Sequence, residues 1–252
     1  MDLGLKDKVA LVTGAGSQIG FGKGIILTLA NEGCDIIAAD VDIEGSKKTA
    51  EEAMALGRKV IAIKADVSNK TEIDEMVNTA LKEFGRIDIL VNNAGASTHP
   101  KLFMEMSDAE IDADININLR GTINCTRAVL GQMISRKNGK IVNISSCGAK
   151  TGGAMVSVYC AAKAGVMVFT KSLGAEVAPM GVNVNGIAPG FGRTGFADQA
   201  PPEIIEGLLK NIPLGRTTTP QDIGNMVAFL ASDVSSDIVG QTFSVDGGLT
   251  MY

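Results

Sequence analysis

Seven short apolar segments recur along the chain, and longer segments of mixed polarity separate them. The short segments are rich in valine and isoleucine and lack polar alternation, which is typical of strands buried on both faces of a parallel sheet. They occupy residues 9–13, 35–40, 59–66, 87–95, 139–146, 182–190 and 241–248. Because the separating segments have helical length, the pattern predicts an α/β fold: a doubly wound, seven-stranded parallel sheet with helices on both faces.

Helical periodicity or capping residues define four of the longer segments. They span residues 70–84, 107–136, 156–180 and 220–232. A further short helix is predicted within residues 195–212, where isolated apolar pairs and two consecutive prolines follow a loop. No repeat or Pro/Ser-rich linker divides residues 1–252, which are therefore predicted to form a single domain.

Composition and charge narrow the class of partner. The chain of 252 residues has a net charge of -5, a sequence pI near 5.0 and no run of Lys or Arg, so we expect no nucleic acid partner. No stretch is long and apolar enough to predict a membrane span. The first residues lack the pattern of a signal peptide, and a cytoplasmic location is the expectation.

The cysteines and the single histidine argue against metal chemistry. Cys34, Cys125, Cys147 and Cys160 show no CxxC spacing and are expected to be free thiols. His99 is the only histidine, which excludes a zinc site built on several imidazoles. We therefore expect no metal site.

The first apolar segment runs into a glycine-rich turn. Residues 13–22 read TGAGSQIGFG and open a helical segment. Such a turn lets backbone N–H groups approach a pyrophosphate at the positive end of a helix dipole. A tight turn without a ligand has the same composition, but the position between a buried strand and a helix favours dinucleotide binding.

Asp40 ends the second apolar segment, about 20 residues past the glycine-rich turn, where the dinucleotide fingerprint has its acidic residue. A carboxylate there accepts hydrogen bonds from both ribose hydroxyls of an adenosine and repels a 2′-phosphate. No basic residue stands at Ser17 or Val41 to bind that phosphate. The pattern favours NAD over NADP, and a surface aspartate at a strand end is the structural alternative.

Other strand segments also end in small or polar residues. Asp66 and Val67 follow the third segment, where they could meet an adenine ring or begin the next helix. Asn92, Ala94 and Gly95 follow the fourth, where they leave room for backbone beside a ligand or form a plain turn.

Tyr159 and Lys163 lie four residues apart in a predicted helix and therefore share a face. A nearby ammonium favours the phenolate, so the pair could form an acid/base group that works near neutral pH. A half-buried tyrosine with a surface lysine is the alternative. Ser145 and Ser146 bring hydroxyls to the carboxyl edge of the sheet, and Asn118 interrupts the apolar face of a helix.

In this order, the motifs resemble those of the short-chain dehydrogenase/reductase family, in its NAD-preferring type. They are TGAGSQIG, Asp40, NNAG, Asn118, Ser146, Tyr159-x-x-x-Lys163, PGFGRT and a closing PLGR, and the likeness covers nearly the whole chain. The resemblance implies a single-domain Rossmann fold for dinucleotide binding and catalysis, with strand order 3-2-1-4-5-6-7 and a small substrate lid at about 192–215.

The resemblance also implies roles. Tyr159 would be the general acid/base, Lys163 would bind the nicotinamide ribose and lower the phenol pKa, Ser146 would bind the substrate oxygen, and Asn118 would hold a proton-relaying water. Ser146 is chosen over Ser145 because the family serine lies thirteen residues before its tyrosine. The residues implied in binding NAD are Gly14, Ser17, Gln18, Ile19, Gly20, Asp40, Asp66, Val67, Asn92, Ala94, Gly95, Tyr159, Lys163, Pro189, Gly190, Gly192 and Thr194.

Gln18 departs from the family pattern, which usually has glycine there, and its side chain could crowd the diphosphate or hydrogen-bond to it. The resemblance implies hydride transfer between nicotinamide and a small to medium secondary alcohol or its ketone. Two alternatives stay open: a reductase of 3-oxoacyl thioesters of acyl carrier protein or CoA, whose family members commonly favour NADPH and carry a basic residue in the glycine turn, and a non-catalytic dinucleotide-sensing module.

By the same analogy, the substrate pocket would be lined by Ser97, His99, Ser146, Cys147, Met155 and Phe191. A solvated loop histidine is the alternative for His99, and a surface charge is the alternative to an anion-binding role for Lys150. The resemblance further implies a homotetramer, built partly from the 107–136 and 156–180 helices.

Overall fold

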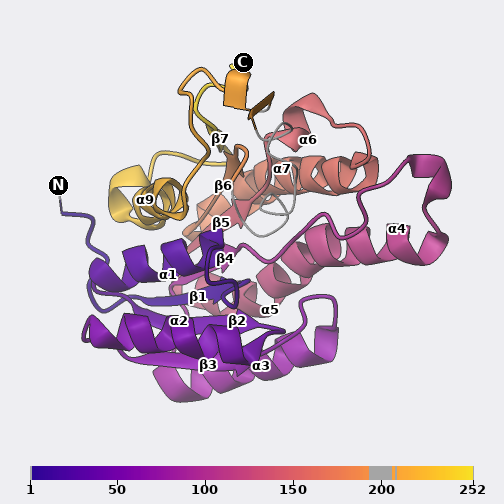
Figure 1. Ribbon diagram of the computed structural model, residues 1–252. Coiled ribbons are helices and arrows are strands. Elements are labelled where there is room, and N and C mark those ends of the chain that lie inside the picture. Colours follow the sequence, from indigo (N-terminus) through magenta and orange to yellow (C-terminus); the bar gives the residue numbers. More distant parts are fainter. Residues whose placement is uncertain (1, 193–205, 208, 252) are drawn as a thin grey trace.

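Seven parallel strands form one sheet in a computed structural model that describes residues 2–192, 206–207 and 209–251 (Figure 1). The strand order is β3-β2-β1-β4-β5-β6-β7, and each neighbouring pair is parallel. The strands are β1 Val9–Thr13, β2 Asp35–Asp40, β3 Val60–Lys64, β4 Ile89–Asn92, β5 Gly139–Ile144, β6 Val182–Pro189 and β7 Thr242–Val245. The predicted fold class and strand order are confirmed. Predicted segments 87–95 and 241–248 overran their strands, because small and polar residues leave the sheet to form loops.

The helices alternate with the strands. They are α1 Phe21–Asn31, α2 Ile43–Ala55, α3 Lys70–Phe84, α4 Asp108–Ile115, α5 Gly121–Arg136, α6 Gly148–Thr151, α7 Ser157–Val177 and α9 Pro220–Ala231. The predicted 107–136 helix is two α-helices joined by a π-helical turn, Asn116–Arg120. The short helix α6 was not predicted from the sequence.

Local sequence sets several of these helix ends. Ser107 begins α4 with a capping box, in which its hydroxyl accepts from the Glu110 N–H and the Glu110 carboxylate accepts from the Ser107 N–H. Thr219 begins α9 in the same way, with Pro220 in the first turn. Gly85 ends α3 in the left-handed region, with φ of 76°.

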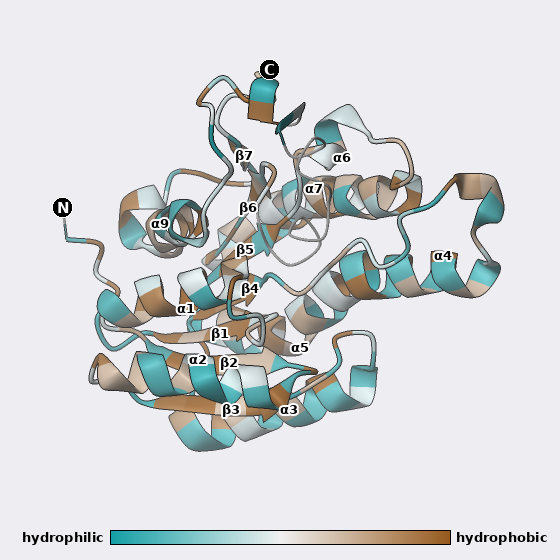
Figure 2. Ribbon diagram, in the orientation of Figure 1, coloured by the Kyte–Doolittle hydropathy of each residue, from teal (hydrophilic) through white to brown (hydrophobic). Residues whose placement is uncertain are grey.

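Two apolar cores lie on opposite faces of the sheet. Alternate residues of β1 serve the two cores: Ala10 and Val12 pack with α1, α2 and α9, whereas Val9 and Leu11 pack with α3, α5 and α7. Figure 2 shows the strands as an apolar band between helices whose outer sides are largely hydrophilic. Burial on both faces explains why the strand sequences lack alternation.

Helices α1 and α9 pack against each other at very short range, and Figure 1 shows them side by side. A Cβ atom on Gly24 of α1 would lie 2.5 Å from the Pro220 Cβ and 2.6 Å from the Pro220 carbonyl carbon. On the α9 side, a Cβ on Gly224 would lie 2.9 Å from the Gly24 carbonyl oxygen. The glycines therefore set how closely α9 approaches the helix that follows the glycine-rich turn.

Within the described part of the chain, no helix is long and apolar enough to cross a membrane. The predicted lid at about 192–215 falls mostly outside the described residues, and Thr194 lies outside them as well.

We expect Gly24→Ala to destabilise the protein by about 1–3 kcal/mol, because the added methyl group meets the proline ring and backbone of α9. Gly131→Ala is the matched control. Gly131 is exposed in α5 with no atom within 4 Å of its Cβ position, so the substitution should stabilise the protein by about 0.5–1 kcal/mol. Urea unfolding of both variants measures the two values, and equal effects would contradict the close packing of α1 on α9.

Candidate active site

The predicted site residues gather at the carboxyl edge of the sheet. The glycine-rich turn follows β1, Asp40 ends β2, Asn92 ends β4, and Pro189 ends β6. Parallel strands place their carboxyl ends at one edge, so residues distant in sequence become neighbours there. In open α/β sheets this edge is where ligands bind.

The glycine-rich turn brings backbone to an open helix start. Gly14 adopts φ of 77°, and a Cβ on Gly22 would lie 1.9 Å from the Gly14 carbonyl oxygen, so the turn folds tightly onto α1. Gly20 precedes α1 without a side-chain cap, and the first turn carries no acidic residue. Helix-start N–H groups left without such a cap fit a pyrophosphate. Ser17 and Ile19 are exposed on the outside of the turn.

The Gln18 side chain packs onto α2. Its amide nitrogen donates to the Gly16 and Gly45 carbonyls at 3.0 and 2.9 Å, and its amide oxygen accepts from Lys23. The side chain thus fastens the turn to the next helix. In the structure both ends of the Gln18 amide have protein partners, and whether the side chain also meets the diphosphate stays a prediction.

Asp40 holds the other side of the same turn. One carboxylate oxygen accepts from the Gly16 N–H and the other from the Asp42 N–H, each at 2.9 Å. A Cβ on Gly16 would lie 3.0 Å from the Asp40 Cγ. The carboxylate therefore sits directly beside the turn, as the NAD prediction requires.

Asp66 and Val67 shape the end of β3 in different ways. Asp66 accepts from the backbone and hydroxyl of Ser68 at 2.8 and 2.7 Å, and the α3 cap is Asn69 rather than Asp66. Val67 is buried against Gly121 of α5, where a Cβ would come within 2.8 Å of the valine methyl group. The structural alternative offered for Asp66, a cap on the next helix, is therefore wrong.

The side chain of Asn92 points into the protein rather than toward the edge. Its amide donates to the Thr126 hydroxyl at 2.9 Å and to the Asn143 side chain at 2.8 Å, and Asn143 donates to the Thr170 hydroxyl at 2.9 Å. The Asn92 side chain is 3% exposed and its oxygen is buried without a partner in the described structure, so the predicted contact with a ligand falls to the backbone. This buried ladder joins β4 and β5 to α5 and α7, and sequence reasoning missed it.

Thr13 and Asn93 are a second pair that sequence reasoning missed. The Thr13 hydroxyl accepts from the N–H groups of Asn93 and Ala94, each at 3.1 Å, and the Asn93 amide donates to the Thr13 and Gly14 carbonyls. These bonds tie the glycine-rich turn to the NNAG loop. The doubled asparagine was the available sign, because one asparagine faces inward and the other bridges the two loops.

Tyr159, Ser146 and Lys163 meet where β5 ends beside the first turns of α7. The Ser145 hydroxyl donates to the Lys163 carbonyl at 2.8 Å, whereas the Ser146 hydroxyl is a hydrogen-bond partner of the Tyr159 phenol. The Lys163 Nζ lies 6.0 Å from the centre of the Tyr159 ring. This geometry supports the choice of Ser146 over Ser145.

The pKa of Tyr159 moves in the opposite direction to the one expected from its spacing to Lys163. Burial raises it, and the Ser146 hydroxyl opposes that rise only in part. Lys163 does not offset the rise: its ammonium lies 6.0 Å from the ring centre and donates to the Ile144 carbonyl at 2.9 Å, and burial lowers its own pKa to about 8. In the ligand-free protein the raised pKa therefore keeps the Tyr159 phenol protonated.

Asn118 and Gly95 provide a fit test for the nicotinamide half of a dinucleotide. Asn118 is fully buried in the π-helical turn, and its side-chain oxygen has no hydrogen-bond partner in the described structure. That oxygen and the Lys163 Nζ lie 2.6 and 2.7 Å from the position that a Cβ on Gly95 would take. A side chain at Gly95 would fill the space that both polar groups face, so the residues present fit the predicted cofactor.

The residues predicted to line a substrate pocket lie on loops around this edge. Met155 is half exposed with φ of 65°, and its carbonyl accepts from the Lys101 N–H at 3.0 Å. Cys147 is half-buried, burial raises its thiol pKa, and its N–H donates to the Pro189 carbonyl at 2.8 Å. Lys150 of α6 is half-buried and donates to the Ser244 hydroxyl of β7 at 2.8 Å, and both alternatives for its role stay predictions.

The loop after β6 is closely packed. A Cβ on Gly190 would lie 2.6 Å from the Asp246 Cα, and a Cβ on Gly192 would lie 2.4 Å from the Phe21 ring. The Phe191 carbonyl accepts from the Thr218 N–H at 2.9 Å. These contacts hold the loop that precedes the predicted lid.

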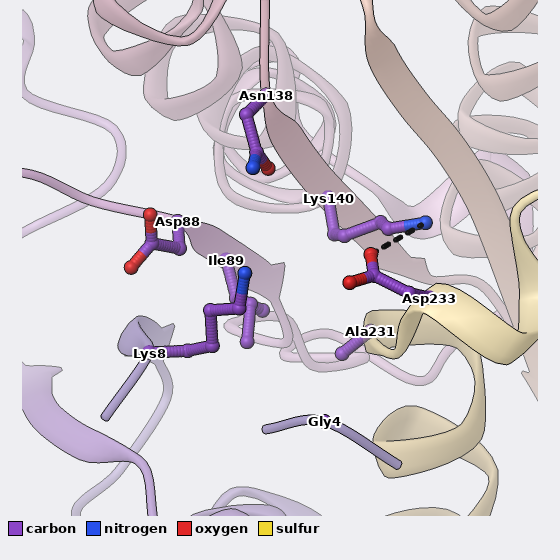
Figure 3. Close-up of a pocket in the computed structure, with 8 residues that line it drawn as sticks. All are labelled: Gly4, Lys8, Asp88, Ile89, Asn138, Lys140, Ala231 and Asp233. Atoms are coloured by element: carbon purple, nitrogen blue, oxygen red, sulfur yellow. Dashed lines mark ion pairs between the residues drawn. The ribbon is translucent and has the colours of Figure 1, made fainter. Parts of the chain in front are cut away.

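A small cavity lies at the opposite, amino-terminal edge of the sheet. Figure 3 shows it between Lys8, Asp88 and Lys140, with the Lys140 ammonium 3.9 Å from Asp233. Each of the first three residues stands within one residue of the start of a strand, so this cavity is separate from the candidate active site. No group of three or more potential metal ligands occurs in the part of the chain that the structure describes.

Known proteins resemble this chain over nearly its whole length. A family model described as enoyl-(acyl carrier protein) reductase matches residues 14–250. The chain is 41% identical over 250 residues to subunit BbsD of (2S)-[(R)-hydroxy(phenyl)methyl]succinyl-CoA dehydrogenase from Thauera aromatica, covering 99% of each protein. It is 40% identical over 247 residues to 3-oxoacyl-[acyl-carrier-protein] reductase FabG from Thermotoga maritima, covering 98% of this chain and 99% of the relative.

A solved structure has the same fold over nearly the whole chain. A protein described as a short-chain alcohol dehydrogenase from Sinorhizobium meliloti matches with a TM-score of 0.91 and 32% identity, over 97% of this chain and 96% of the other. With the strand order, the glycine-rich turn and the grouping of Ser146, Tyr159 and Lys163, these matches establish that the chain belongs to the short-chain dehydrogenase/reductase family of nicotinamide-dependent oxidoreductases.

Proposed function

We propose that the protein is an NAD(H)-dependent oxidoreductase that interconverts a secondary alcohol and its ketone, with Tyr159 as general acid/base. The observation that carries this proposal is the convergence of Tyr159, Ser146, Lys163 and Asn118 at one edge of the sheet, beside a Gly95 that leaves the space open. All four positions are filled by the residue types that the chemistry needs, which argues against a non-catalytic sensing module.

The carboxylate of Asp40 supports NAD rather than NADP as the cofactor. It lies beside Gly16, where the adenosine ribose would bind, and a second carboxylate, Asp42, follows two residues later. A 2′-phosphate there would face like charge. The Lys23 ammonium donates to the Gln18 side chain and pairs with Glu52 of α2 at 2.6 Å, so both side chains near the turn already have partners within the protein.

The substrate class that we propose is a 3-hydroxyacyl or 3-oxoacyl thioester. The names of two relatives support this, because one acts on a hydroxylated acyl-CoA and the other on a 3-oxoacyl group of acyl carrier protein. A 3-hydroxyacyl thioester is itself a secondary alcohol, so the proposal narrows the general reaction without changing it. It makes the thioester alternative from the sequence the leading substrate class, with NAD(H) as the cofactor.

In the proposed mechanism the side chains of the protein transfer the proton. A bound nicotinamide dinucleotide supplies or accepts the hydride. Ser146 hydrogen-bonds the substrate oxygen, and Tyr159, protonated in the ligand-free protein, donates to that oxygen during reduction. Lys163 and Asn118, which face one space beside Gly95, restore the proton to Tyr159.

Three further expectations stay predictions: residues 1–252 acting as one catalytic domain, a cytoplasmic location and a homotetramer. Exposed apolar side chains on the helices implied at the subunit interface support the tetramer, with Val168 of α7 64% exposed and Ile115 of α4 37% exposed.

Tyr159→Phe should lower kcat by about 10²–10⁴-fold, because the variant keeps the ring and loses the proton donor. NADH binding, measured by fluorescence titration, should stay within a factor of about two, since the backbone around the site is unchanged. Turnover is measured with a 3-oxoacyl thioester and NADH. Wild-type kcat in the variant would remove Tyr159 from the mechanism.

Asp40→Asn should reduce the preference of the enzyme for NADH over NADPH by about tenfold in kcat/KM, because it removes a charge that opposes the 2′-phosphate. Glu44→Gln is the control, since Glu44 is exposed in the first turn of α2 and bonded to Lys47. An unchanged cofactor ratio in Asp40→Asn, or the same change in both variants, would contradict the assignment.

Lys163→Met should change how stability depends on pH. The folded protein releases the Lys163 proton near pH 8, whereas the unfolded chain holds it to about 10.5. The unfolded state therefore binds more protons between these values, and wild-type stability rises relative to the variant by up to about 3 kcal/mol from pH 7.5 to 10.5. Urea unfolding across this range measures the trend, and Lys171→Met, on the exposed side of the same helix, should show none.

A further inference from the structure

A buried carboxylate lies under the loop that follows the NNAG motif. Asp114 of α4 is only 2% exposed, and its side chain accepts from both the hydroxyl and the N–H group of Thr98, the latter at 3.4 Å. The His99 Nδ1 lies 2.8 Å from the Thr98 hydroxyl oxygen and 3.5 Å from the same carboxylate. Thr98 therefore connects the only histidine of the chain to a carboxylate inside the protein.

This arrangement sets the tautomer of His99. A carboxylate oxygen only accepts, so the single hydroxyl hydrogen of Thr98 is used toward Asp114. Toward the ring, the Thr98 oxygen can then only accept, and the His99 Nδ1 must carry a hydrogen. In the neutral ring the Nε2 is left with its lone pair as a hydrogen-bond acceptor.

The same loop also orients Asn118. Its amide nitrogen donates to the Ala96 carbonyl at 2.8 Å and to the Asp114 carbonyl at 2.9 Å, which uses both of its hydrogens. The side-chain oxygen must then point the other way, into the space beside Gly95 that the Lys163 ammonium also faces. One of the two carbonyls that fix Asn118 belongs to the loop that Asp114 and Thr98 hold down.

We infer that Asp114 is a positioning residue, which acts through Thr98 to fix the 96–99 loop against Asn118 and to hold His99 with its Nδ1 protonated. The catalytic part of this inference rests on the proposed function, in which Asn118 takes part in proton delivery. Asp114 touches neither substrate nor cofactor, and its effect reaches the reaction through the Ala96 carbonyl and the His99 ring.

Two matched pairs of variants test the inference. Thr98→Val removes the bridging hydroxyl, whereas Thr98→Ser keeps it. Asp114→Ala removes the buried carboxylate, whereas Asp112→Ala removes an exposed one from the same helix. Because His99 is the only histidine, its ring nitrogens can be read by ¹⁵N NMR in the ligand-free enzyme without assignment.

We expect wild type, Thr98→Ser and Asp112→Ala to show the Nδ1-protonated ring in alkaline buffer, and Thr98→Val and Asp114→Ala to lose it. With a 3-oxoacyl thioester and NADH, the latter two should lose about tenfold in kcat and show a larger solvent deuterium isotope effect on kcat, because proton delivery through Asn118 becomes slower. The Kd for NADH should change by less than about twofold in every variant.

The inference is overturned if Thr98→Val matches Thr98→Ser in tautomer and in kcat, or if Asp114→Ala matches Asp112→Ala. Should Asp114→Ala fail to fold, the Thr98 pair decides by itself. If wild type turns over no thioester, the proposed function fails instead, and the NMR comparison still decides whether Asp114 and Thr98 set the state of His99.

Discussion

The candidate active site depends on an ammonium that the fold buries and that has no carboxylate partner among the described residues. Lys163 is 2% exposed, burial alone lowers its pKa, and its one hydrogen bond in the described structure goes to the Ile144 carbonyl at the end of β5. Such a group is costly in an apolar interior. The fold tolerates it because Gly95 and the Asn118 side-chain oxygen leave polar space on its other side, which a ribose and water can use.

Close approach of backbones also shapes the space that this ammonium faces. Gly22 brings α1 onto the turn after β1, Gly24 brings α9 onto α1, and Gly95 leaves the space before Lys163 open. Between them, Thr13 and Asn93 join the two loops by side-chain to backbone hydrogen bonds. The candidate site is thus held by close backbone contacts and hydrogen bonds at the sheet edge.

Sequence patterns predicted the fold well because the signal of a buried strand is local in the sequence. Strands buried on both faces need runs of apolar residues, and the segments 9–13 and 35–40 match β1 and β2 residue for residue. Family spacing identified Ser146 and Tyr159 as a candidate pair, and the structure brings them together. The sequence did not predict where two side chains point: Asn92 faces inward, and Gln18 folds onto α2. It also did not predict that the pKa of Tyr159 rises, because burial outweighs the effect of its neighbours. Each depends on partners far away in sequence, such as Asn143 for Asn92 and Gly45 for Gln18.

The π-helical turn at Asn116–Arg120 has a consequence for how this protein can vary. A turn of this kind holds one more residue than an α-helical turn, and each residue rotates a helix by about 100°. Losing or gaining a single residue here would rotate Asn118 so that its oxygen no longer faces the space beside Gly95, even if every candidate site residue were kept. Chain length in this stretch is therefore a constraint on the site in its own right, separate from the identity of Asn118.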